Sequence, residues 1–168
     1  DLPTIKKDGE LSSNDPHIIN WTVKYNYGKK NLGTVTLTDV LSIFGDVNNE
    51  KNPGAVIDNT IKVYEVDPDI DGNVVAESEI PVTVSPVVYV NGKFTIPNLD
   101  ANGKAYYITF SSYVPVGLNE TIVNTISDDL SSPNSDKASV PVNTIPTGGK
   151  VGAQLVDENG NPYIEWTI

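Results

Sequence analysis

Three polar residues, Lys7, Asp39 and Asn124, fall on strand faces that are otherwise apolar. Their apolar neighbours on these faces are Ile5 beside the lysine, Val35 and Leu37 beside the aspartate, and Ile122 and Ile126 beside the asparagine. An unpaired charge or amide in such a position is costly to bury. Burial disfavours the charged form of an ionisable group, so it would make the lysine a neutral, nucleophilic amine and keep the aspartate protonated.

Together these residue types predict the formation of an amide bond. A protonated Asp39 could donate a hydrogen bond to the carboxamide oxygen of Asn124 and shuttle protons. Attack of the lysine amine on the carboxamide carbon would expel ammonia and leave a Lys–Asn isopeptide cross-link. The alternation does not choose between Lys6 and Lys7. Each residue taken singly could also be a polar group at a strand end, or a lysine whose head group reaches water.

The elements that must position these residues are strands. The apolar set is mostly Val and Ile with eight Tyr, and 13 Gly and 12 Pro separate the apolar runs. Alternating runs recur at short intervals, among them IINWTVKYN, TVTLTDVL, NTIKVYEV, AYYITF and ETIVNTI. No stretch longer than about a dozen residues has apolar positions at helical spacing. The sequence therefore predicts an all-β sandwich.

The overall charge excludes several classes of partner. Lys and Arg number 11 against 22 Asp and Glu, a formal net charge of −11. Nucleic acids and anionic membrane surfaces attract clustered positive charge, so neither is an expected partner. The chain has no Cys, which removes disulfides and thiolate metal sites. It also has no apolar run long enough for insertion into a membrane.

A Lys-x-Gly motif followed by a Trp strand occurs twice. The lysines Lys7 and Lys150 are 150 − 7 = 143 residues apart, and Trp21 and Trp166 are 166 − 21 = 145 residues apart. This period is too long for a solenoid and is typical of tandem domains.

The repeat predicts three parts of the chain: a β-sandwich domain over residues 1–142, a Pro/Gly linker over 143–149, and the truncated first strands of a following homologous domain over 150–168. Lys150 would then be unreacted, because its aspartate and asparagine partners would lie in that next domain. The apolar strands of 150–168 would be exposed, or would pair with a sheet edge of this domain or of a neighbouring molecule.

An acidic loop is the one candidate metal site. Asp67, Asp69 and Asp71 alternate and are followed by Gly72, as in the first half of an EF-hand loop, but the twelfth position is Ser78 rather than Glu. The alternative is a polar hairpin loop with Asp-Gly turn chemistry. No other cofactor is expected, and the carboxylate pairs Asp128/Asp129 and Glu77/Glu79 are interpreted as solvated surface.

The order of the motifs resembles the collagen-adhesin family of Gram-positive surface proteins. The motifs are IKKDG, INWTVKYN, VTLTDVL, IKVYEV, KFTIPNLDANGKAYYITF and IVNTI, and the resemblance covers residues 5–142. It implies an immunoglobulin-like β-sandwich of the adhesin type, stabilised by an autocatalytic intramolecular isopeptide bond. Transferred motif by motif, it assigns the cross-link to Lys7 and Asn124 and the general acid/base role to Asp39.

The resemblance also implies a function. We expect an extracellular, wall-anchored adhesin module that binds a host extracellular-matrix protein such as collagen or fibrinogen, or that helps to present such a binding head beside neighbouring repeat domains. The cross-link would form once per molecule, so the chain would not be a turnover enzyme. The alternatives are a structural stalk repeat without a ligand and, more remotely, a carbohydrate-binding module.

Overall fold

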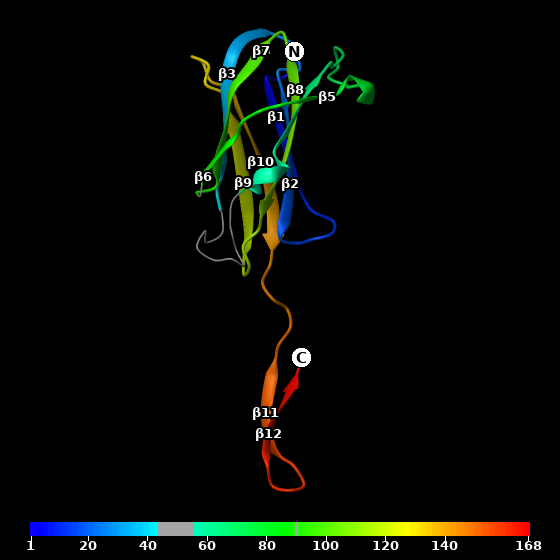
Figure 1. Cartoon of the computed structure of the whole chain (residues 1–168), viewed down its shortest axis with the longest axis vertical. Helices are drawn as coiled ribbons and strands as arrows, with labels where there is room; N and C mark the ends of the chain where they lie inside the picture. Colours follow the sequence, from blue (N-terminus) through cyan, green and yellow to red (C-terminus); the bar gives the residue numbers. More distant parts are fainter. Residues whose placement is uncertain (44–55, 90) are drawn as a thin grey trace.

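The computed structural model describes residues 1–43, 56–89 and 91–168, which form two facing antiparallel sheets and a separate hairpin (Figure 1). In spatial order, the first sheet contains β1 (Ile5–Leu11), β2 (Ile18–Tyr25), β8 (Ala105–Tyr113), β4 (Lys62–Val66) and β5 (Ile80–Val82). The second contains β10 (Ser135–Asn143), β9 (Asn119–Ser127), β3 (Asn31–Leu41), β7 (Lys93–Asn102) and β6 (Val87–Tyr89). This confirms the predicted all-β sandwich.

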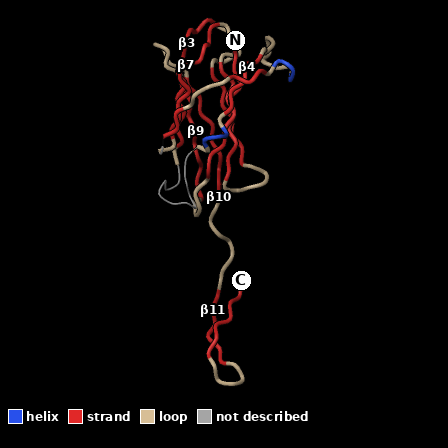
Figure 2. Tube along the Cα trace, viewed as in Figure 1, coloured by secondary structure: helices blue, strands red, loops and turns tan. Residues whose placement is uncertain are grey.

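Short 3-10 helices and turns connect these strands. The 3-10 helices are η1 (Asp58–Thr60) and η2 (Ala76–Ser78), the two blue segments of Figure 2. Within the part of the chain that the structure describes, no helix has the length and apolar character needed to cross a membrane.

The strands form where apolar and polar residues alternate, because successive side chains of a strand point to opposite faces. In β2 every second residue is buried, and β9 continues the same alternation. The buried faces of both sheets meet in one core, where Phe94 and Phe110 pack edge to face with ring centroids 4.8 Å apart. Trp21 and Tyr25 are the largest fully buried side chains of this core.

The two lateral edges of the sandwich are closed differently. At one edge β1 lies beside β10, so the first and last strands of the domain meet across the gap between the sheets. At the other edge residues 83–86 pass from β5 in the first sheet to β6 in the second. The first of these edges positions the candidate site.

Residues beyond the sandwich form a hairpin of β11 (Val151–Val156) and β12 (Pro162–Thr167). Figure 1 shows it extending from the end of β10 on a linker, away from both sheets. Its two strands pair with each other, and not with an edge of this domain as one sequence-based interpretation allowed. Its large apolar side chains are exposed, including Tyr163, Ile164 and Trp166.

Candidate cross-link site

The three polar residues singled out in the sequence converge inside the sandwich. Lys7 Nζ lies 3.1 Å from Asp39 Oδ2, and Asn124 Nδ2 donates to Asp39 Oδ1 at 2.6 Å. All three side chains are buried, with at most 2% of any residue exposed. Lys6 points outward and is exposed, so the structure places Lys7 in the interior and leaves Lys6 on the surface.

Strand register explains the convergence. Asp39 on β3 pairs with Ile126 of β9, and Leu41 pairs with Asn124. Asp39 and Asn124 are therefore diagonal neighbours on the inner face of the second sheet. Lys7 reaches them from β1 of the opposite sheet, so the site joins three strands and both layers of the sandwich.

Aromatic rings surround the amine and keep water away from it. Lys7 Nζ lies 4.5 Å from the ring centroid of Phe110 and 5.3 Å from that of Trp21. The indole is held in place because its Nε1 donates to the buried hydroxyl of Ser112 at 2.8 Å.

Burial changes the protonation of both ionisable groups. It lowers the pKa of Lys7, although the neighbouring Asp39 carboxylate opposes this change. Burial likewise raises the pKa of Asp39, against the effects of Lys7 and of the Asn124 hydrogen bond. Desolvation favours the uncharged form in each case. The geometry and the pKa directions together favour a neutral amine beside a protonated carboxylic acid.

The carboxamide of Asn124 is only half satisfied. Its nitrogen faces Asp39, whereas its Oδ1 has no hydrogen-bond partner among the described residues. From the sequence we expected the carboxamide oxygen, not the nitrogen, to face the aspartate. Half a turn of the amide about its Cβ–Cγ bond would exchange the two ends and give a protonated Asp39 an acceptor. Unpaired buried acceptors are uncommon in folded proteins, so this one points to a role in chemistry.

The acidic loop that resembled half of a calcium site is organised as a turn. The Asp69 carboxylate accepts the backbone N–H groups of Asp71 and Asn73 and the Asn73 side chain, and these hydrogen bonds lower its pKa. Asp67 forms an ion pair with Lys29 instead. No group of three or more His, Cys, Asp or Glu side chains able to hold a metal ion occurs in the described residues.

The same turn recurs in the C-terminal hairpin. There the Asp157 carboxylate accepts the backbone N–H groups of Asn159 and Asn161 and the Asn161 side chain, although the middle position is now Asn instead of Asp. The hairpin forms this turn without a carboxylate at the middle position, so the turn geometry does not depend on that carboxylate. The shared pattern therefore supports the interpretation of the acidic loop as a turn.

The sequence-based interpretation of Asp128 as solvated surface is wrong. Asp128 is 6% exposed and not solvated surface; it accepts the hydroxyl of Tyr25 at 3.0 Å and the side chain of Asn134 at 2.8 Å. Asn124 and Ile126 point inward, and continuing this alternation by two residues predicts that Asp128 also points inward. The hydrogen bonds of Asp128 connect β2 to the turn after β9, so Asp128 has a structural role.

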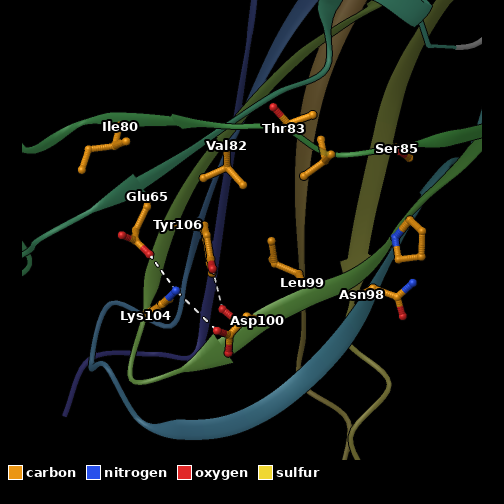
Figure 3. A pocket seen from close by; sticks show the side chains of 12 residues that line it. Glu65, Ile80, Val82, Thr83, Ser85, Asn98, Leu99, Asp100, Lys104 and Tyr106 are labelled. Carbon is orange, nitrogen blue, oxygen red and sulfur yellow. Dashed lines mark hydrogen bonds and ion pairs between the residues drawn. The ribbon is translucent and has the colours of Figure 1, made fainter.

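A surface cavity of about 440 Å³ lies at the opposite edge of the sandwich, between β5 and β7 (Figure 3). Lys104 lies in it between Glu65, at 3.5 Å, and Asp100, at 3.4 Å. The Tyr106 hydroxyl donates to the Asp100 carbonyl. These polar groups satisfy one another, and the cavity is separate from the buried site.

Comparison with known proteins supplies a family and a fold. The family model described as "Collagen binding domain" matches residues 2–139. ACE19, the collagen binding subdomain of the Enterococcus faecalis surface protein ACE, has a TM-score of 0.58 at 12% identity, covering 84% of this chain and 98% of its own. The collagen adhesin CNA from S. aureus has a TM-score of 0.59 at 10% identity, covering 84% of this chain and 49% of its own.

A third structure extends the set. The collagen binding domain of the Erysipelothrix rhusiopathiae surface protein RspB has a TM-score of 0.53 at 15% identity, with coverage of 80% of this chain and 45% of the other. The chain thus spans about half of the longer adhesin structures that it resembles. At these identities the likeness concerns the fold. No curated protein sequence matches the chain.

Proposed function

This chain belongs to the collagen-binding domain family, and from that premise we propose that it is an adhesin module of a Gram-positive cell surface, closed by an isopeptide bond between Lys7 and Asn124. The observation that carries the proposal is the buried contact of an amine, a carboxyl group and a half-satisfied amide. Surface display and wall anchoring are inferred from the family and its structural relatives.

The proposed reaction uses the side chains of the chain alone. The neutral Nζ of Lys7 attacks Cγ of Asn124 while protonated Asp39 donates to the carboxamide oxygen, once the amide has turned to present it. A new Nζ–Cγ bond forms and the Cγ–Nδ2 bond breaks. One proton from Nζ passes through Asp39 to Nδ2, which leaves as ammonia. Asp39 ends as it began, so it acts as general acid and base in a single turnover.

The bond would fasten β1 in the first sheet to β9 in the second. Because Lys7 lies near the start of the domain and Asn124 near its end, a pulling force would pass through the bond and bypass most of the fold. The link would also restrict the unfolded chain as a disulfide does, by about 4–5 kcal/mol for a loop of this size. It would thereby compensate for the absence of cysteine.

The proposed ligand is a fibrous protein of the host extracellular matrix. This proposal rests on the family description and on the structural relatives, which are collagen-binding proteins. Binding of the full chain to immobilised collagen and fibrinogen, measured by surface plasmon resonance, tests it. Binding to neither would favour the stalk repeat, which needs no ligand.

Intact-mass spectrometry of the full chain tests the cross-link. Loss of ammonia leaves the protein about 17 Da lighter than its calculated mass. We expect this deficit in the natural chain and its absence in Lys7→Ala, Asp39→Ala and Asn124→Ala, with Lys6→Ala as the matched control that retains it. A natural chain of full calculated mass would refute the covalent mechanism and leave the fold intact.

We also propose the division of the chain into a sandwich domain over residues 1–142, a linker over 143–149, and the first two strands of a following domain over 150–168. The support is a shared register: Gly9 pairs with Trp21 in the sandwich, and Gly152 pairs with Trp166 in the hairpin. Limited proteolysis tests this division. We expect cleavage first within 143–149, and cleavage first inside the sandwich would contradict it.

A further inference from the structure

We propose that Asp136 is a positioning residue for the cross-link: it fixes the backbone of Lys7 at the edge where β1 meets β10 and so holds the amine at Asp39 and Asn124. This inference rests on the proposed isopeptide reaction. It adds a fourth residue, on a fourth strand, that neither the motif pattern nor the family comparison assigns.

A direct hydrogen bond joins Asp136 to the backbone of Lys7. The carboxylate of Asp136 accepts the backbone N–H of Lys7, with Oδ2 2.7 Å from the nitrogen. Among the strands that the structure describes, β1 is an edge strand that pairs with β2 alone, and β10 is an edge strand that pairs with β9 alone. In the described part of the chain β1 and β10 meet without a ladder of backbone hydrogen bonds, and a side chain bridges the two edges at the residue that bears the nucleophile.

Strand register also places Asp136 in line with Asp39. Asp136 pairs with Ile126, and Ile126 pairs on its other side with Asp39. The anchor and the proposed acid/base catalyst therefore lie in one row across the second sheet. The hydrogen bond from Asp136 sets the position of the Lys7 backbone relative to that row, and the lysine side chain then spans the remaining distance to Asp39.

The anchor carries a charge, and this has a consequence for pH. The ionisable groups that act on Lys7 are Asp39 from β3, Asp136 from β10 and its own neighbour Asp8 on β1, and each of them in its ionised form raises the lysine pKa against the larger effect of burial. The nucleophile must be neutral. Asp136 therefore improves the geometry while its charge shifts the reaction towards higher pH.

Two substitutions separate these effects. Asp136→Asn keeps a side-chain oxygen able to accept the Lys7 N–H but removes the charge, whereas Asp136→Ala removes the acceptor. The matched control is Asp129→Ala, which removes another carboxylate that accepts a backbone N–H, that of Thr36 at 2.9 Å, away from the site.

The experiment is a time course of intact mass after cell-free synthesis of the full chain, with translation stopped and the mass deficit followed in buffers of different pH. We expect Asp136→Ala to slow cross-linking by about tenfold or more, because a small displacement of a reacting group is costly. Asp136→Asn should react within about threefold of the natural chain and have its pH–rate profile displaced to lower pH. Asp129→Ala should match the natural chain.

A second readout covers the case in which Asp136→Ala folds poorly. Amide hydrogen-exchange measurements should show that the Lys7 N–H is still protected in Asp136→Asn. In Asp136→Ala this protection should be lost. Cross-linking of Asp136→Ala at the natural rate, or an Asp136→Asn profile that does not move, overturns the inference. A natural chain without the mass deficit instead overturns the proposed function, and that result is seen before any variant is made.

Discussion

The first two strands of the sandwich and the C-terminal hairpin share one local design but differ in their surroundings. Gly9 lies opposite Trp21 in the sandwich, and Gly152 lies opposite Trp166 in the hairpin. In each, the lysine two residues before the glycine lies over the indole, with Nζ 5.3 Å from the ring centroid in the sandwich and 4.7 Å in the hairpin.

The glycine explains why the design recurs. A Cβ at Gly9 would lie 2.3 Å from Trp21 Cε3, and one at Gly152 would lie 2.6 Å from Trp166 Cζ3. Both distances are far below van der Waals contact, so each indole occupies the space that a side chain would fill. Two paired strands are enough to bring lysine and tryptophan together.

What differs is the environment. Trp21 is fully buried and donates to Ser112, whereas Trp166 is 57% exposed. Lys7 contacts Asp39, whereas β11 and β12 form a two-stranded sheet of their own within the described residues. The hairpin therefore orients the amine, and a second sheet must supply the desolvation and the reaction partners.

The largest expected difference between the two regions is in stability. Lys7→Met should lower the free energy of unfolding by about 4 kcal/mol, because it removes the proposed cross-link. Lys150→Met should leave it unchanged, because the hairpin lies outside the sandwich. Chemical denaturation of both variants measures this, and equal stabilities would contradict a covalent tie at Lys7.

A smaller effect is expected at the paired glycines. Gly9→Ala should destabilise the sandwich by about 1–3 kcal/mol, because the new methyl group displaces a buried indole from a packed core. Gly152→Ala should leave the thermal unfolding of the sandwich unchanged and only shift the fluorescence of Trp166. If both substitutions lowered the melting temperature equally, the hairpin would have to be part of the folded domain.

The smallest effect is a pH dependence, seen in Asn124→Ala, which cannot cross-link. The pKa of Asp39 is raised in the folded state, so the folded state binds more protons just above pH 3.8 and stability falls as pH rises there. The pKa of Lys7 is lowered, so the unfolded state binds more protons just below pH 10.5 and stability rises towards that pH.

Stability, measured as the denaturation midpoint, should therefore pass through a trough between these two pH values. We expect this trough to disappear when Lys7→Met and Asp39→Asn are added to Asn124→Ala, because these substitutions remove the buried ionisable pair from the site. Lys150→Met added instead is the matched control and should leave the trough in place. A trough that persists without the Lys7–Asp39 pair would assign it to other groups.

Much of the fold could be predicted from alternation alone. The period-two pattern identified the strands, and it placed Asp39 and Asn124 on inner faces because side-chain direction along a strand is a local property. It left open whether Lys6 or Lys7 joins them. The repeated Lys-x-Gly and Trp spacing predicted a second strand pair, because glycine and indole fit each other within one hairpin.

The tertiary structure decided everything that depends on which strands are neighbours. It brought β1 against β10 and thereby made Asp136 a partner of Lys7, it gave Asp128 the Tyr25 hydroxyl as a hydrogen-bond donor, and it placed Lys6 on the surface. These outcomes depend on sheet order and register between segments up to 129 residues apart in sequence, which no local pattern encodes.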